Sequence, residues 1–269
     1  MFDWTWGTFG TTHLVTLIAA IVLIFAIYVW LHDESRKKQI IVLFFLSLSG
    51  LAAIIYNLVA WGSPWEYLPL HLCSLNAIIL PFAVLTRKKW ACNLLLLWSL
   101  GSYVALILNY DMADAQLLSL PFFFYYFPHV LEAGIPILLF AFGLVKRDHK
   151  CIKSTLSITF IAYTLIHIIN VAINNGIIGP GNIEVNYMFS YSPTNPLLQF
   201  FWMIVPYRYF YMLLIIPIII VYLCWWYLPD LLKLHKSKRG LRKRLRAVEE
   251  YYDEYEEEYI EEIIEKKYD

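Results

Sequence analysis

The segment Tyr67-Leu-Pro-Leu-His-Leu-Cys-Ser-Leu-Asn76 decides how the rest of this sequence is interpreted. It is an apolar run in which His71 and Cys73 stand two residues apart, at a place where a membrane-crossing helix should begin. Ionisable residues are costly inside a bilayer, so a functional role is the first hypothesis for them. The other polar residues of the apolar segments are therefore placed by their depth relative to this pair.

The composition predicts an integral membrane protein of the all-α class. Of 269 residues, 60% are hydrophobic and 16% are charged, whereas soluble domains have about 45–50% apolar and about 25% charged residues. The apolar residues fall in blocks of about 18–25, the length that a helix needs to cross a bilayer. No Lys or Arg precedes the first block, so we expect a retained helix and not a cleaved signal peptide.

Seven transmembrane helices are expected. Their approximate bounds are 12–31, 39–61, 68–86, 90–108, 119–145, 154–175 and 205–228. The predicted organisation is a seven-helix transmembrane domain over 1–230, followed by a charged tail over 231–269. Prolines inside the fifth segment predict that this helix is bent or broken.

The charges of the loops predict the orientation. Basic residues gather at 36–38, 87–89 and 146–153 and after the last helix, whereas the other loops are nearly free of them. Basic loops stay cytoplasmic, so the alternation predicts an outer N-terminus and a cytoplasmic C-terminus in a multi-pass protein of the cell membrane. The formal net charge is zero and the basic residues flank membrane segments, so no nucleic-acid partner is expected.

The tail is basic over 233–246 and acidic over 249–265. The basic part is expected to lie on anionic lipid headgroups. For the acidic part, a solvated helix or a disordered segment is the favoured interpretation, and a helix that binds a protein partner is the alternative.

Seven polar residues are expected in the outer half or the middle of the bilayer, and the inner half holds nothing comparable. They are His71, Cys73, His129, Glu132, His167, Asn170 and Arg208. A helix rises about 1.5 Å per residue, and counting from the expected helix ends places all seven on the same side of the membrane.

Each of these residues has a functional and a structural interpretation. Cys73 is a candidate nucleophile if a histidine serves as its base, and a small buried hydrophobe otherwise. His129 and Glu132 share a helix face, either as a general base with its orienting carboxylate or as a polar pair that bridges helices. His167 and Asn170 have the same spacing, and interhelical hydrogen bonding is the favoured interpretation for them.

Two further residues and a metal site complete the candidates. His71 is a candidate for a hydrogen bond to a neighbouring helix, and Arg208 either binds a phosphate or carboxylate headgroup or extends to the membrane surface. A metal held by the histidines, the cysteine and the glutamate is less favoured, because neither H-E-x-x-H nor C-x-x-C occurs. We expect no metal and no cofactor.

At these residues the sequence resembles a known family, the bacterial YwaF-type membrane proteins, which share a family with animal transmembrane protein 164. The resemblance rests on Pro69–Cys73, Arg87–Trp90, Phe122–His129 and Asn186–Phe189, in that order, and it covers about 5–228. It implies a multi-helix acyltransferase of the bacterial plasma membrane that moves a fatty acyl chain between phospholipids. The cysteine and histidine that this activity requires fall on Cys73 and His129.

The mechanism implied by the resemblance has membrane phospholipids and lysophospholipids as its partners. Arg208 would hold the lipid phosphate, Glu132 or Asn170 would orient the histidine, and Asn170 or Asn76 would donate to a developing oxyanion. A transporter or permease-like component remains the alternative, because buried histidines and proline-broken helices also mark solute pathways. A non-catalytic membrane protein is the third possibility.

Overall fold

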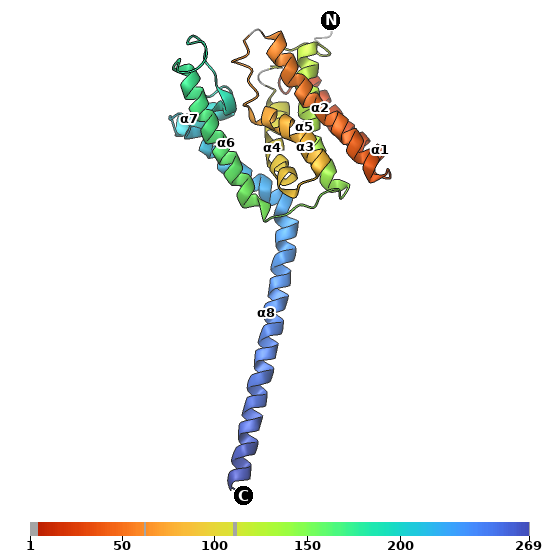
Figure 1. Cartoon of the computed structure of the whole chain (residues 1–269), viewed down its shortest axis with the longest axis vertical. Helices are drawn as coiled ribbons and strands as arrows, with labels where there is room; N and C mark the ends of the chain where they lie inside the picture. Colours follow the sequence, from red (N-terminus) through yellow and green to blue (C-terminus); the bar gives the residue numbers. More distant parts are fainter. Residues whose placement is uncertain (1–4, 62, 110–111, 269) are drawn as a thin grey trace. The chain divides into compact units, whose positions relative to one another are not determined.

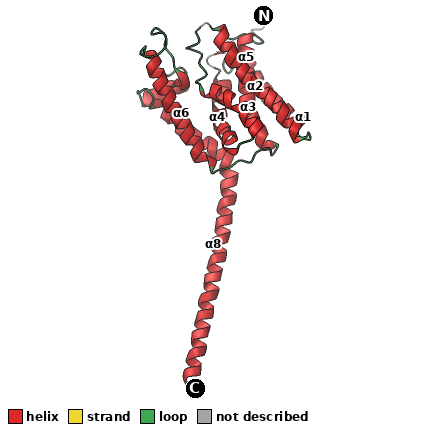
Figure 2. Cartoon of the chain, viewed as in Figure 1, coloured by secondary structure: helices red, strands yellow, loops and turns green. Residues whose placement is uncertain are grey.

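The computed structural model describes residues 5–61, 63–109 and 112–268, and its named elements in that range are all helical (Figures 1 and 2). They are α1 (Thr11–Leu31), α2 (Arg36–Ala60), α3 (Leu72–Thr86), α4 (Lys89–Leu108), α5 (Leu120–Ala141), α6 (Cys151–Asn174), η2 (Tyr187–Phe189), α7 (Pro196–Ile204), η3 (Tyr211–Ile215) and α8 (Ile216–Tyr268). The chain divides into two compact units, Met1–Ile220 and Val221–Asp269.

Six helical stretches within the described residues are long and apolar enough to cross a membrane. They are Thr11–Leu31, Arg36–Ala60, Lys89–Leu108, Leu120–Ala141, Cys151–Asn174 and Tyr211–Lys243. The helix α3 is also apolar but has only 15 residues, which at about 1.5 Å per residue is shorter than a hydrocarbon core of about 30 Å. The expectation of an all-helical, multi-pass membrane protein is confirmed at this level.

The start of α3 differs from the expectation. The sequence predicted a helix from about residue 68, whereas the helix begins at Leu72 and His71 before it is extended, with φ −74° and ψ 154°. Pro69 explains the difference, because proline disfavours helical geometry in the residue before it and has no N–H of its own. The correction moves Cys73 from the second turn of the helix to the first.

The segment before the last helix also differs from the expectation. Residues 205–210 were predicted to be helical, but Val205 has φ −130° and ψ 89°, and regular structure resumes only at Tyr211. Pro206 accounts for this extended geometry in the same way as Pro69. Conversely, Pro196–Ile204 was expected to be loop and forms α7, with the Asn195 side chain accepting a hydrogen bond from the Leu198 N–H. Arg208 therefore lies in a turn and not in the first turns of a helix.

The helix α5 is continuous, although Pro128 and Pro136 lie inside it. It ends at Ala141, four residues before the expected end, and Gly143 follows with φ +65°, a value that glycine adopts without strain. The expected break is therefore absent from the secondary structure of α5.

The helices α2, α3, α4 and α5 pack on one another as neighbours and form the centre of the first unit (Figure 1). Their largest apolar cluster joins Leu43, Ala83, Ala91 and Leu139 at the end where α3 connects to α4. At the same end, Lys89 Nζ lies 3.1 Å from Asp148 Oδ2, so the basic turn between α3 and α4 lies beside the basic turn between α5 and α6. The basic turns between the helices therefore share one end of the bundle.

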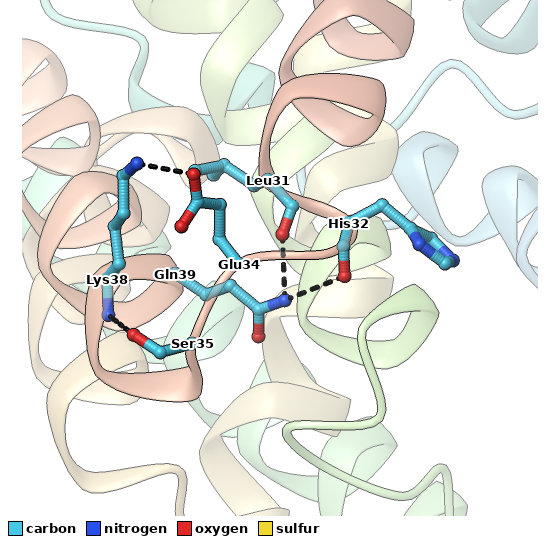
Figure 3. Close-up of polar contacts among 6 residues, drawn as sticks. All are labelled: Leu31, His32, Glu34, Ser35, Lys38 and Gln39. Atoms are coloured by element: carbon cyan, nitrogen blue, oxygen red, sulfur yellow. Dashed lines mark hydrogen bonds and ion pairs between the residues drawn. The ribbon is translucent and has the colours of Figure 1, made fainter.

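The turn between α1 and α2 lies near that cluster and is held by side-chain hydrogen bonds (Figure 3). The buried Gln39 amide donates to the Leu31 carbonyl over 2.9 Å and to the His32 carbonyl over 3.4 Å. The Ser35 hydroxyl accepts from the Lys38 N–H over 3.3 Å. These bonds satisfy backbone groups that helix ends otherwise leave without partners.

The opposite end of the bundle is covered by the N-terminal segment. The buried Trp6 indole donates to Thr16 Oγ1 over 2.8 Å. The Phe9 N–H donates to Nδ1 of the buried His13, so the other ring nitrogen, Nε2, donates to the Leu106 carbonyl over 2.8 Å. Both ring nitrogens of His13 therefore serve to fix this segment on α1 and α4.

The second unit consists of the part of α8 beyond Ile220. Its backbone is helical through Tyr268, and its basic residues Lys233, Lys236, Arg239 and Arg242 are exposed. For the acidic part of the tail, helical backbone is therefore found where disorder was one of the expectations.

Candidate functional site

Cys73 is the second residue of α3, and this position gives its sulfur backbone donors. His71 precedes the helix and makes no side-chain hydrogen bond that caps it. The N–H groups of Cys73 and Ser74 and the Ser74 hydroxyl lie within hydrogen-bonding reach of the sulfur. Free N–H groups at a helix N-terminus carry partial positive charge, so they are placed to receive negative charge that develops near the half-buried sulfur.

Glu132 of α5 lies where α2, α3 and α4 also meet. Its side chain interacts electrostatically with Cys73, and the buried Glu132 carboxyl accepts a hydrogen bond of 2.9 Å from the Ser102 hydroxyl of α4. A Cβ built on Gly50 of α2 would lie 2.9 Å from Glu132 Oε1 and 2.6 Å from the Ala77 Cβ of α3. The absence of a side chain at Gly50 therefore lets α2 approach both α3 and the carboxyl group.

His129 is held by the backbone of its own helix. Its Nδ1 lies 2.6 Å from the Tyr125 carbonyl oxygen, and since a carbonyl only accepts, Nδ1 carries the hydrogen and Nε2 keeps its lone pair. The Tyr125 ring also packs on the imidazole, with 4.5 Å between centroids. In this tautomer His129 can accept a proton at Nε2.

His71 connects His129 to the loop that precedes α7. The two histidines interact electrostatically. The His71 ring lies 5.5 Å from the ring of Tyr187 and 5.4 Å from that of Phe189. His71 therefore contacts aromatic rings of η2, and the expected hydrogen bond to a neighbouring helix stays a prediction.

Cys73 thus interacts electrostatically with Glu132, and His71 with His129. No hydrogen bond joins Cys73 and His129 in the part of the chain that the structure describes. The Tyr125 carbonyl holds the His129 ring, while Glu132 bonds to Ser102 and Asn170 bonds to Tyr187.

Asn170 and His167 hold a turn in the loop after α6. The buried Asn170 amide donates to the Tyr187 carbonyl and to Ser190 Oγ, each over 2.8 Å, and accepts from the Tyr187 N–H over 3.0 Å. His167 Nδ1 lies 3.0 Å from the same Ser190 hydroxyl. Met188, inside this turn, has φ +51°, which side chains rarely adopt. The amide of Asn170 is fully engaged, so it cannot donate to an oxyanion.

Arg208 is exposed, and its guanidinium stacks on the Tyr191 ring with 3.7 Å between Cζ and the ring centroid. It interacts electrostatically with His167. Among the described residues, no ion pair involves Arg208, so its donors are available to an anionic ligand.

Asn76 stands apart from the other polar residues of the bundle. It lies one turn after Cys73 on α3 and is fully buried, and neither its amide nitrogen nor its amide oxygen has a hydrogen-bond partner. Most buried polar side chains in proteins are hydrogen-bonded, so this exception requires an explanation.

Sequence reasoning missed three residues of this site. Ser102 and Tyr125 have no local signal, since a serine or tyrosine in an apolar helix is common. Gly50 follows Ser47 and Ser49 in α2, and small residues three or four apart favour close helix packing in membranes, so this position could have been found.

The site offers no arrangement for a metal ion. Within the ranges that the structure describes, no group of three or more His, Cys, Asp or Glu side chains is placed to hold one. The less favoured metal interpretation therefore has no geometric support.

These features define a multi-pass helical membrane protein whose bundle carries a cysteine in the first turn of a helix, a buried glutamate that interacts with it electrostatically, and a buried asparagine without a hydrogen-bond partner. The chain belongs to the TMEM164 family, which it matches over residues 8–227. The expected relationship to the family of transmembrane protein 164 is thereby confirmed. No curated protein and no solved structure matches the chain significantly.

Proposed function

We propose that this protein transfers fatty acyl groups between membrane lipids through a thioester on Cys73. The observation that carries the proposal is the position of Cys73 as the second residue of α3, where backbone N–H groups lie within hydrogen-bonding reach of its sulfur. Such donors at a helix start can stabilise the negative charge that develops when the sulfur attacks an ester.

His129 is the proposed base. Its Nδ1 is engaged by the Tyr125 carbonyl, so Nε2 is free to take the thiol proton. Since no hydrogen bond connects the two residues, proton transfer requires a bridging water molecule or a side-chain rotation. Membership of the family of transmembrane protein 164, whose animal members the sequence resembles in its Cys73 and His129 motifs, supports the same pair.

The reaction has two halves. The Cys73 thiolate attacks the carbonyl carbon of an acyl ester, the ester C–O bond breaks, and the leaving lysolipid alkoxide takes the proton that His129 accepted. In the second half, the hydroxyl of an acceptor lysolipid attacks the thioester, the C–S bond breaks, and Cys73 regains a proton. The apolar bundle around the site limits access of water, which favours transfer over hydrolysis.

Arg208 is the proposed contact for the lipid phosphate, since it is exposed and forms no ion pair within the described residues. The proposed orientation places this residue and the Cys73 site toward the outer leaflet, with the basic turns and the basic part of α8 on the cytoplasmic side of the cell membrane. The exposed basic residues of α8 support binding to anionic headgroups there. Binding of a protein partner by the acidic part of the tail is a separate proposal, on which acyl transfer does not depend.

The test is acyl transfer to the detergent-solubilised protein from a phospholipid that carries an alkyne-tagged fatty acyl chain. Intact mass should increase by one acyl group, the adduct should be released by hydroxylamine, and peptide analysis should place it on Cys73. Cys73→Ala should abolish labelling, and His129→Ala should reduce it by about 10²–10⁴-fold, the usual contribution of general base catalysis.

Cys151→Ala is the matched control, because this cysteine is also half-buried and in the first turn of a helix but lies beside the basic turn of α6. It should label as wild type does. Labelling that persists without Cys73, or that is absent from a folded wild-type protein, contradicts the thioester mechanism and leaves transport or a structural role as the better account.

A further inference from the structure

Asn76 has a polar side chain with no hydrogen bond in a place where no water reaches it. Its exposed fraction is 0%, and both the amide nitrogen and the amide oxygen are buried without a partner. An unsatisfied buried amide destabilises a protein, and replacement by an apolar side chain of similar shape removes that cost. Packing alone therefore does not explain why an asparagine occupies position 76.

The position of Asn76 relates it directly to Cys73. The two residues are three apart in α3, so they share a face of the helix, and helical side chains lean toward the N-terminus, which brings the Asn76 amide over the turn that holds Cys73. The neighbouring Leu72 side chain packs against Gly101 of α4, one residue before the serine that binds Glu132. Asn76 therefore lies in the same inter-helix space as the Cys73 site.

The other asparagine that could serve this site is already engaged. Asn170 uses its amide nitrogen for two hydrogen bonds and its amide oxygen for a third, all within the turn at Tyr187–Ser190. Asn76 is the amide whose donors remain unused.

We propose that the Asn76 side-chain amide, together with the N–H groups at the start of α3, binds the carbonyl oxygen of the acyl ester substrate. The proposal rests on the acyl transfer proposed above and assigns the residue that receives the oxyanion. The unpaired amide is then a donor held ready for a substrate oxygen, and the ligand class is a carboxylic ester of a lipid or the thioester formed from it.

The proposed role concerns one step in each half-reaction. When the Cys73 sulfur bonds to the carbonyl carbon, the π electrons of the C=O bond move to the oxygen, and the Asn76 N–H donates to the resulting oxyanion. When the tetrahedral intermediate collapses, these electrons return to form the C=O bond, and the alkoxide leaves. The amide donates a hydrogen bond throughout and loses no proton. Donors that are fixed before the reaction are the most effective at this task.

The experiment compares two reactions of the same thiol in Asn76→Leu and in wild type. One is acylation of Cys73 by the tagged phospholipid, which passes through an oxyanion. The other is alkylation of Cys73 by iodoacetamide, which forms none. Both rates are measured on the Cys73 peptide by mass spectrometry, with the unfolding midpoint of each variant measured in the same detergent.

For Asn76→Leu, we expect the ratio of acylation to alkylation rates to fall about 10²–10³-fold, as for the loss of an oxyanion donor. The unfolding midpoint should stay equal or rise, because the unsatisfied amide is gone. Asn76→Ala should lower the ratio in the same way. A purely structural role would lower both rates together or neither, so a ratio within about threefold of wild type in these variants overturns the inference.

The control is Asn93→Leu, near the start of α4. Asn93 is also buried, but its amide donates to the Lys89 carbonyl over 2.7 Å and accepts from the Asp148 N–H over 3.1 Å. Its loss should lower the unfolding midpoint and leave the ratio unchanged. Failure of wild type to acylate at all would refute the acyl transfer itself, and acylation that is normal without the Asn76 amide would refute only the role of Asn76.

Discussion

Replacing Gly50 by alanine should destabilise the bundle, although alanine is the better helix former. The added Cβ would lie 2.6 Å from the Ala77 Cβ, whereas carbon atoms in contact are about 3.5–4.0 Å apart. Neither methyl group can rotate away, so α2 and α3 must separate by about 1 Å. The same Cβ would lie 2.9 Å from Glu132 Oε1 and would displace the carboxyl that accepts from Ser102.

The expected change in the free energy of unfolding is the difference between opposing effects. Overpacking a core costs about 1–3 kcal/mol. Weakening a buried hydrogen bond to a carboxylate adds about 1–3 kcal/mol if the bond is lost. The better helix propensity of alanine returns about 0.5–1 kcal/mol. The net loss in the free energy of unfolding for Gly50→Ala should therefore be about 1–5 kcal/mol if the hydrogen bond from Ser102 is lost.

The assay is unfolding in mixed detergent micelles, followed by tryptophan fluorescence. Gly101→Ala is the matched control in a neighbouring helix, because its added Cβ would meet nothing closer than Leu72 Cδ2 at 3.4 Å. It should be neutral or slightly stabilising. Combining Gly50→Ala with Ala77→Gly removes the closest overlap and should recover most of the lost stability.

The reasoning fails if Gly50→Ala is as stable as wild type, or if Ala77→Gly does not rescue it. Either result would mean that α2 and α3 do not approach as closely as the structure places them. A Gly101→Ala variant that is equally damaged would mean that any methyl group added to this bundle is harmful.

Two other predictions concern the loops. Asn170→Ala should lower the free energy of unfolding by about 2–4 kcal/mol, because it leaves buried backbone groups of Tyr187 without partners, and limited proteolysis should cut the loop after α6 faster. Hydrogen bonds from the Lys150 N–H and from Lys89 hold the pKa of Asp148 below its ordinary value of 3.8. A lowered carboxyl pKa contributes stability that is present above pH 3.8 and lost as the pH falls through the folded value. Unfolding measured from pH 7 to pH 3 should therefore show a wild-type advantage over Asp148→Asn that shrinks only at the acid end, and an advantage that grows on acidification would refute this sign.

The membrane-spanning organisation could be predicted from the sequence because it depends on local length and composition. A segment such as 12–31 must be a helix wherever it lies in a bilayer, since its backbone groups find no water there. The bounds of α1, α2, α4 and α6 lie within three residues of the expected ones. Of the larger errors, those before Leu72 and before Tyr211 both follow a proline whose effect on the residue before it was given too little weight, and the third is the end of α5 at Ala141.

The sequence by itself determined the class of protein, the family and the polar residues that deserve attention, since apolar block length and short motifs are properties of the chain alone. Only the tertiary structure decided which of those residues meet. Gly50 lets α2 approach both Ala77 of α3 and Glu132 of α5, and the Asn170 amide is engaged by a turn that is distant in sequence. Helix packing decides which polar groups find hydrogen-bond partners. For this reason, only the folded bundle shows that the Asn76 amide has none.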